Sequence, residues 1–335
     1  MTLPRIPRIN SHNSWSQLEE VWLGDVYPVE WYEHLDPEVR DVFQQITERT
    51  REDLNQIQRV IESLGVVVQR PRYTKIDNHI NGLGNLIKPD ICPRDTFVVV
   101  DNRLFVPPST HCWDHVLEQY RSDPNSHIVR NFSPDNQFNG ANVVRTGRDL
   151  LLDLYWHQEK GWSYTNELPG YRVHQVDNGG HLDGCFAVLR PGLIMANEYF
   201  KDYDVYYPGW ELIHLGKPSY WPDKNKPNRP HSNGKFYDTT VGTNRAFNEH
   251  VIRHALDWVG TYTETYFELN CLVVNEHCVV MMGENEKLFR YLESREIQVH
   301  VVPMRTRPFW DSGVHCMTVD IRRQSTLEDY FPDRG

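Results

Sequence analysis

The chain has 335 residues, of which 39% are hydrophobic and 24% charged, and its formal net charge is −11. This length fits one large domain or two ordinary ones, and the acidic balance argues against broad binding to nucleic acid or anionic membranes. No apolar run approaches the roughly 20 residues of a membrane span, and the N-terminus lacks the apolar segment of a signal peptide. The six cysteines show neither zinc-ligand spacing nor the density of a disulfide scaffold, so we expect free thiols in the cytoplasm.

The first predicted helix runs from about Pro37 to Leu64, because apolar residues near its end recur at helical spacing. Gly65 is expected to end this helix, and Val66–Val68 is predicted to form a buried strand after it. The loop around Asp95 then leads into a predicted hairpin over residues 96–106. A helix, a strand, a polar loop and a hairpin thus form one unit.

Loop-and-hairpin segments of this kind recur along the chain and indicate an internal repeat. Five loops introduce a strand or a hairpin, and they carry, in chain order, Asp95, Asn142, Asp183, Asn270 and Cys316. The last loop is followed by a single strand, for which Leu18–Leu23 can supply the partner and close a ring through the two termini. One interval is nearly double the others, which predicts an insertion or lid at about residues 198–262 within a single domain of residues 1–335.

A repeat of this period predicts a propeller-like ring or a solenoid. The alternative is ordinary α/β structure whose strand-and-turn pairs only look alike. In a ring, the loops at one end converge on the axis, and here they carry the residues that a central active site needs: Asp95, Asn139, His181, Asp183 and Cys316.

Cys316 is a candidate nucleophile. Ser312 and Gly313 stand shortly before it, and the glycine permits an unusual backbone and the close approach of a substrate. A thiolate is a good nucleophile when a neighbouring cation lowers the pKa of the thiol, and a bound guanidinium would itself supply that cation. The alternative is a buried cysteine at the start of a strand.

His181 and Asp183 flank Leu182, and alternate residues of a strand point to one face, so both can face one site. Histidine titrates near neutrality and can protonate a leaving amine and then deprotonate an incoming one. Asp95 can grip the NH₂ groups of a guanidinium bidentately. The alternative for His181 is a residue without a catalytic role, since the chain has 16 histidines. The alternative for Asp95 is an aspartate that stabilises a turn or caps a helix.

Several segments, taken together and in order over nearly the whole chain, resemble the amidinotransferase family of the pentein superfamily, whose members include glycine and inosamine-phosphate amidinotransferases. Phe138–Asp149 is similar to the family's F-D-A-A-[DN]-x-x-R-x-G-R-D segment, and Val314–Arg323 is similar to its nucleophile segment F-H-C-x-T-x-D-[IV]-R-R. The other matching segments are Ser14–Val21, Cys92–Asp95, His181–Asp183 with Leu189–Leu193, and the tail Thr326–Tyr330.

The resemblance implies a five-bladed, pseudo-symmetric α/β propeller, the pentein fold, and transfer of an amidino group from an arginine-like guanidino donor to an amine. Cys316 would attack the guanidino carbon, and His181 would protonate the departing amine and activate the acceptor. No metal or organic cofactor is implied. The expected partners are two small molecules, with neither nucleic acid nor membrane, and the oligomeric state is left open between a monomer and a homodimer. Substrate-binding roles fall on Asp95, Asp183, Asn139, Arg94, Glu268 and Lys201.

The sequence departs from the family at three places. Asn139 stands where the family has the carboxylate partner of its histidine. Phe200 stands where it has an arginine that grips the donor's carboxylate, and Lys201 is the candidate replacement. Thr263–Phe267 replaces a serine-rich loop. Two alternatives to transfer therefore stay open: hydrolysis of the same covalent intermediate, as in deiminases, and binding of a guanidino compound without turnover.

Overall fold

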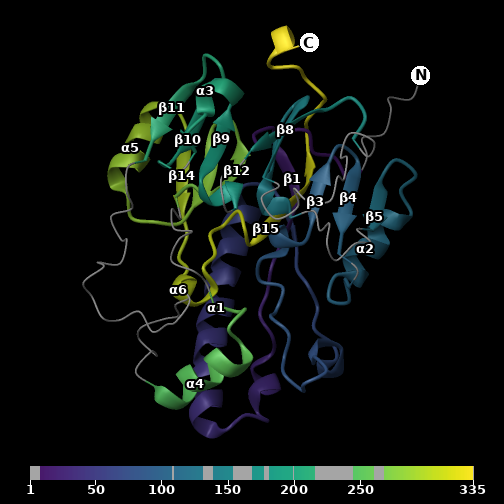
Figure 1. Ribbon diagram of the computed structural model, residues 1–335, viewed down its shortest axis with the longest axis vertical. Helices are drawn as coiled ribbons and strands as arrows, with labels where there is room; N and C mark the ends of the chain where they lie inside the picture. Colours follow the sequence, from purple (N-terminus) through teal and green to yellow (C-terminus); the bar gives the residue numbers. More distant parts are fainter. Residues whose placement is uncertain are drawn as a thin grey trace.

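The computed structural model describes residues 8–107, 109–130, 139–153, 168–176, 181–198, 200–215, 244–259 and 268–334. Within these segments the strands form five sheets of three strands each. Figure 1 shows the sheets in the upper part of the molecule, with the long helix α1 running from their level down to α4 at the bottom. The helices are α1 (Pro37–Ser63), α2 (Asp114–Arg121), α3 (Tyr203–Tyr206), α4 (Arg245–His254), α5 (Glu286–Ser294) and α6 (Arg307–Trp310).

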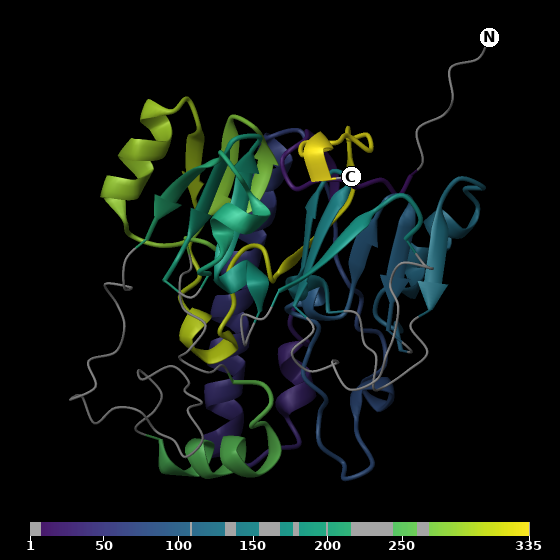
Figure 2. The ribbon, with the colours of Figure 1, turned by 45° about the horizontal axis from the view of Figure 1, so that its top comes forward.

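All five sheets follow one plan, an antiparallel pair of strands extended by a third strand that runs parallel to its neighbour. The turned view in Figure 2 shows the sheets spread around the centre of the molecule. Grouped by sheet, the strands are β15 (Thr318–Arg323), β1 (Leu18–Leu23) and β2 (Val67–Gln69); β3 (Val98–Val100), β4 (Arg103–Val106) and β5 (His127–Arg130); β6 (Val143–Thr146), β7 (Asp149–Asp153) and β8 (Arg172–Val176); β9 (Phe186–Arg190), β10 (Leu193–Ala196) and β11 (Glu211–His214); and β12 (Leu272–Asn275), β13 (Cys278–Met281) and β14 (Gln298–Val301).

The ring closes through the two ends of the chain. β1 pairs antiparallel with β15, so that Val21 lies opposite Asp320 and Leu23 opposite Thr318. The predicted partnership of the N-terminal strand with the strand after Cys316 is therefore confirmed, and with it the five-bladed, pseudo-symmetric α/β propeller.

The strand after the first helix, predicted at Val66–Val68, does not join the hairpin that follows it in the sequence. β2 instead pairs in parallel with β1, the strand that precedes α1. A strand–helix–strand crossover connects parallel neighbours, and α1, α2, α3 and α5 each connect the middle strand of a sheet to its third strand. β2 is also an edge strand, and Val67 is 49% exposed, so the expected burial is wrong there.

Helix α1 packs one apolar face into the core. It starts at Pro37, a favoured residue at the first helical position, and Gly65 follows its end with φ of 82°. Its buried face packs with residues of α4, β12 and β13 in one hydrophobic cluster, and burying each large side chain stabilises the fold by about 1.5–3 kcal/mol. Among the described helices, none has the length and apolar character that crossing a membrane requires. The large apolar side chains of the buried face are Phe43, Ile46, Leu54, Ile57 and Ile61.

One buried carboxylate links four of the five sheets. Asp320 in β15 is 1% exposed and pairs with Arg94 before β3 (2.8 Å), with Arg145 in β6 and with Arg323 of its own strand (2.8 Å). Arg323 extends the link to β12, because its Nη2 donates to the carbonyl oxygen of Val273 at 2.8 Å. Removing the carboxylate would leave buried cations unpaired, at a cost of about 3–5 kcal/mol.

Three short 3₁₀ turns bring the loops together at the centre of the ring. Pro93–Asp95, Gly140–Asn142 and Leu182–Gly184 each precede a hairpin, and neighbouring turns contact one another in this order. Gly140 permits the closest approach, because a Cβ atom there would lie 2.3 Å from the carbonyl oxygen of Phe97. The loops that the repeat predicted to converge therefore do so.

Candidate active site

Cys316 lies just before β15 and is 7% exposed. Its Sγ lies 2.8 Å from Nδ2 of Asn270, which donates to it, and 3.3 Å from Oδ2 of Asp183. Its backbone N–H donates to Oδ1 of Asn270 at 2.9 Å. Two side chains from different modules therefore hold the sulfur, one as a hydrogen-bond donor and one as an acceptor.

Asp183 joins the thiol to the neighbouring imidazole. Its Oδ2 lies 2.8 Å from Nδ1 of His315 as well as 3.3 Å from the Cys316 sulfur. We had predicted that His181 and Asp183 lie in a strand. They do not, because Leu182–Gly184 forms a 3₁₀ turn that His181 precedes. This turn, rather than strand alternation, places the two side chains in the site.

His181 is contacted by an amide. Nδ2 of Asn139 lies 3.1 Å from Nε2 of the ring, and Oδ1 of Asn139 accepts the backbone N–H of Ala141 at 2.9 Å. The second bond fixes the orientation of the amide, so Asn139 presents its NH₂ group to the imidazole. Nε2 is then the acceptor and the neutral ring carries its proton on Nδ1, which lies 3.9 Å from Oδ1 of Asp95.

Two carboxylate oxygens in the site accept no hydrogen bond. The Oδ1 atoms of Asp95 and Asp183 are both buried, and no group in the described part of the chain donates to either. A buried acceptor without a donor costs about 1–3 kcal/mol, and more when it is charged. The side chains of His181 and Asp95 are 27% and 33% exposed, so this side of the site is open to a ligand with N–H donors.

The electrostatics favour the neutral thiol when the site is empty. Burial raises the pKa of Cys316 well above its usual value, and the charges of Asp183 and Asp95 raise it further, against the Asn270 hydrogen bond. Burial alone would raise the pKa of Asp183, but the hydrogen bond from His315, together with the charges of His315, His181 and Arg94, lowers that pKa. Burial also raises the pKa of Asp95. The protonated thiol therefore donates to the ionised Asp183.

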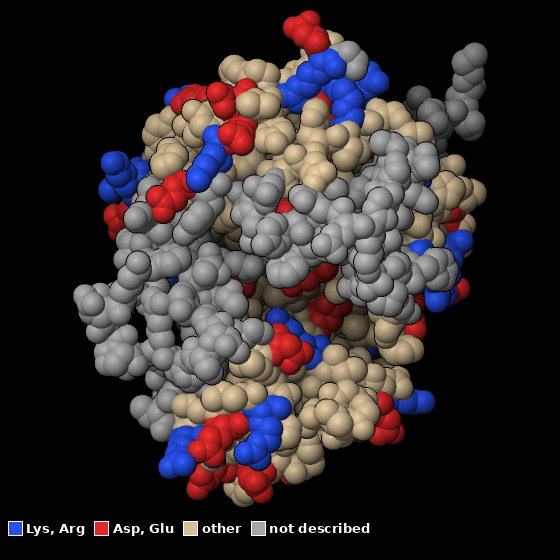
Figure 3. All heavy atoms as spheres, in the orientation of Figure 1, with Lys and Arg blue, Asp and Glu red and all other residues tan. Residues whose placement is uncertain are grey.

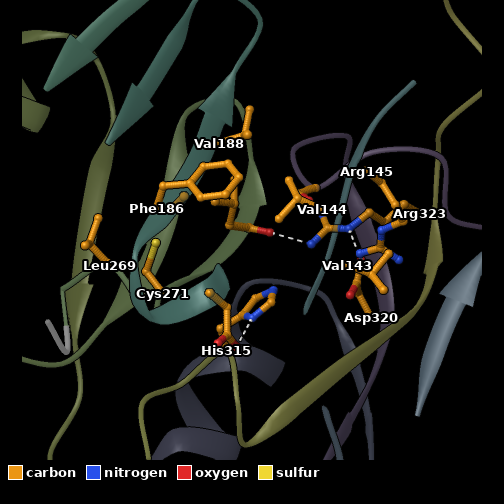
Figure 4. Close-up of a pocket in the computed structure, with 14 residues that line it drawn as sticks. Val143, Val144, Arg145, Phe186, Val188, Leu269, Cys271, His315, Asp320 and Arg323 are labelled. Atoms are coloured by element: carbon orange, nitrogen blue, oxygen red, sulfur yellow. Dashed lines mark hydrogen bonds and ion pairs between the residues drawn. The ribbon is translucent and has the colours of Figure 1, made fainter. Parts of the chain in front are cut away.

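A small cavity lies behind this cluster. It has a volume of about 30 Å³, and Asp183 and His315 contribute to its lining. Figure 4 shows His315 at its edge, with Asp320 and Arg323 on one side and Phe186 and Cys271 on the other. Figure 3 shows acidic side chains within a hollow near the centre of one molecular face.

Arg94 and Glu268, two residues predicted to bind substrate, are both buried. Arg94 is 1% exposed and pairs with Asp320, while its Nε donates to the carbonyl oxygen of Thr318 at 2.8 Å, so it is a structural cation here, and its substrate contact stays a prediction. Glu268 is 2% exposed, and its carboxyl group packs where a Cβ at Gly283 would lie, at 2.4 Å.

Phe200 lies in the core, and its neighbour Lys201 lies at the surface. Phe200 is 4% exposed and stacks on Phe186 with ring centroids 4.1 Å apart, whereas Lys201 is exposed. An aromatic side chain thus fills the core at the position where the family has its carboxylate-binding arginine. Among the segments that the sequence singled out, those outside the described residues are Phe138, Thr263–Phe267 and, within the predicted insertion at 198–262, residues 199, 216–243 and 260–262.

Sequence analysis gave no role to two residues that contact the site. Asn270 had been identified only as a repeat position, and its equivalence to Asp95 and Asp183 is the signal that could have assigned it a role. His315 precedes Cys316 directly and carried no pattern of its own. Within the described segments, no group of three His, Cys, Asp or Glu side chains could hold a metal ion.

Comparison with known proteins begins from the fold. An inosamine-phosphate amidinotransferase from Streptomyces griseus superposes with a TM-score of 0.69 at 20% identity, over 96% of this chain and 99% of that one. An amidinotransferase of the saxitoxin biosynthetic pathway from Microseira wollei gives 0.70 at 18% identity, over 97% and 100%. DDAH from Pseudomonas aeruginosa gives 0.51 at 12%, over 90% and 99%. The protein is therefore a pentein-fold protein with a cysteine, a histidine and two aspartates near its centre.

The sequence comparison is more specific. The chain matches no protein-family model. It is 24% identical over 391 residues to a putative inosamine-phosphate amidinotransferase 2 from Streptomyces griseus, over 96% of this chain and 99% of the relative. It is 20% identical to an L-arginine:L-lysine amidinotransferase from Pseudomonas savastanoi pv. phaseolicola, over 96% of each. The chain is thus a relative of the amidinotransferases over nearly its whole length, and the resemblance found in the sequence is confirmed.

Proposed function

We propose that this protein is a cysteine-dependent amidinotransferase, which moves an amidino group from a guanidino donor to an amine. The observation that carries the proposal is the pair of buried Oδ1 atoms on Asp95 and Asp183, which accept no hydrogen bond and belong to the loops around the Cys316 thiol. A guanidinium ion is planar, cationic and rich in N–H donors, so it complements two carboxylates. The full-length similarity to named amidinotransferases supports the same chemistry.

Binding of the donor activates the thiol. A guanidinium between Asp95 and Asp183 offsets the negative charges that raise the pKa of Cys316. The thiol proton leaves and the thiolate attacks the guanidino carbon, forming a C–S bond. The C–N bond to the donor then breaks, and the departing amine takes up the proton. His181 carries that proton, because its neutral ring can accept it and pass it on.

The second half of the reaction reverses these steps with a new amine. The acceptor nitrogen attacks the amidino carbon of the covalent intermediate while His181 removes its proton. The C–S bond breaks, its electron pair returns to sulfur, and the acceptor leaves as a guanidino compound. With arginine as the donor, the products are ornithine and the amidinated amine.

The reaction proposed here uses thiol chemistry, which suits a reducing compartment. All six cysteines are free in the structure, and disulfides are rare in the cytoplasm. We therefore place the enzyme in the cytoplasm, with two small molecules as its partners.

Product analysis tests transfer against its alternatives. The protein is incubated with arginine, with and without a panel of primary amines that includes lysine and glycine. Ornithine that appears only when an amine is added supports transfer. Citrulline formed without an amine marks hydrolysis of the same intermediate. Neither product, with arginine binding detected by calorimetry, would replace the proposal by a protein that binds without turnover.

A further inference from the structure

Asn270 contacts the reactive sulfur more closely than any acidic residue of the site. It lies two residues before β12, is 6% exposed, and its Nδ2 is 2.8 Å from the Cys316 sulfur. In the described part of the chain it is the side chain that donates a hydrogen bond to Sγ, whereas Asp183 accepts one. Its role therefore differs from that of the carboxylates at equivalent repeat positions.

The orientation of the Asn270 amide is fixed by a second bond. Its Oδ1 accepts the backbone N–H of Cys316 at 2.9 Å, so the nitrogen and not the oxygen faces the sulfur. Its backbone carbonyl also accepts the N–H of His315 at 3.2 Å. Three contacts thus tie Asn270 to His315 and Cys316, shortly before β15.

Gly313 leaves the space that the amide occupies. A Cβ atom at this position would lie 2.4 Å from Cβ, 2.5 Å from Oδ1 and 2.6 Å from Cγ of Asn270, distances that real Cβ atoms do not tolerate without movement. The glycine before the cysteine, which the sequence associated with substrate approach, is therefore needed to admit the side chain of Asn270.

We propose that Asn270 is a catalytic residue whose amide N–H stabilises the thiolate of Cys316, both as nucleophile and as leaving group. The charges of Asp183 and Asp95 disfavour the thiolate, and the burial of the sulfur opposes it as well. A neutral donor offsets these effects without repelling a cationic guanidinium. When the C–S bond of the intermediate breaks, the electron pair returns to sulfur, where the same N–H again donates to it. This assignment rests on the proposed function for its catalytic meaning.

The test measures the thiol directly and without substrate. The rate of alkylation of Cys316 by iodoacetamide is followed from pH 6 to 11 by peptide mass spectrometry, in the full chain. Asn270→Ala removes the donor and should raise the pH midpoint by about 1 unit or more, from the strength of hydrogen bonds to charged groups. Asn270→Asp keeps the shape and the acceptor oxygen but replaces the donor by a carboxylate, so its midpoint should rise further.

A matched control separates this effect from loss of structure. Asn275 ends β12 in the same sheet, and its Nδ2 donates to Gln17 Oε1 at 3.0 Å, so Asn275→Ala should leave the midpoint unchanged. Unchanged midpoints in a folded Asn270→Ala or Asn270→Asp protein overturn the assignment. Alkylation needs no amidino transfer, so failure of the proposed function would appear separately, as missing products in the unmodified protein.

Discussion

Asn139→Asp tests how the site controls the proton on His181. The amide now donates to Nε2 across 3.1 Å. A carboxylate at position 139 would instead accept a hydrogen bond from the protonated Nε2 and attract the positive charge of the imidazolium. Two unit charges at this separation interact by about 5 kcal/mol at an effective dielectric constant of about 20. Solvent reaches 27% of the His181 side chain, so we expect a rise of about 1–2 units in the pKa of His181.

The assay is an NMR titration of the His181 ring in both proteins, paired with rates from pH 5 to 10. The limb of the rate profile that requires the imidazolium should move to higher pH in the variant. Asn142→Asp is the matched control, because Oδ1 of Asn142 accepts the backbone N–H of Leu182 at 3.3 Å. An unchanged His181 pKa in Asn139→Asp would refute the reasoning and show that another acid already serves the ring. Loss of activity with the expected pKa would show that the amide contacts substrate.

Five further substitutions probe the proposed nucleophile, the two carboxylates proposed to bind guanidinium, and the fold. Cys316→Ala should abolish turnover while the melting temperature changes little. Cys316→Ser should be nearly as inactive, because a serine hydroxyl at this position has no strong base to activate it. Activity assays and thermal melts check both variants, and retained turnover in either would contradict the mechanism. Asp95→Asn and Asp183→Asn should each weaken transition-state binding by at least about 2 kcal/mol, measured as a lower kcat/KM. An unchanged kcat/KM in either variant would show that this carboxylate does not bind the substrate. Burial alone would raise the pKa of Asp149, but its hydrogen bonds to His174, Arg172 and Arg334 lower that pKa from 3.8 to about 2, which is worth about 2 kcal/mol of stability. This stability is present above pH 4 and is lost as the pH falls towards 2, so urea unfolding of Asp149→Asn should show a flatter acid limb, and equal acid limbs would contradict the assignment.

The sequence alone supports the ring and much of its centre. The hairpins repeat visibly because each loop ends in a polar residue before an apolar strand, and the N-terminal strand lacked a partner that the strand after Cys316 could supply. The sequence predicted Val66–Val68 as a buried strand, whereas β2 is an edge strand in which Val67 is 49% exposed, because a short extended segment carries no mark of the sheet it joins. That choice depends on the crossover of the preceding helix, which is a property of the fold and not of the segment.

In the site, too, the local sequence identified some residues, whereas the roles of others depend on tertiary contacts. The motifs identified Cys316, His181 and the two aspartates, but Arg94 shares its motif with Asp95 and still turns into the core, because the carboxylate of Asp320 lies there. The role of Asn270 depends on its contact with a residue 46 positions away, and local sequence cannot show such a contact. Asn139 also illustrates the limit, since only the bond from Ala141 reveals that its amide donates to the ring.

Intact-protein mass spectrometry after brief mixing with arginine, without an acceptor amine, tests the proposed chemistry most directly. We predict a mass increase of one amidino group per chain, located by peptide mapping on Cys316, lost when an acceptor amine is added and absent from Cys316→Ala. A covalent mechanism through this cysteine would be contradicted by release of ornithine or citrulline with no adduct at any time. It would also be contradicted by an adduct on another residue that persists in Cys316→Ala.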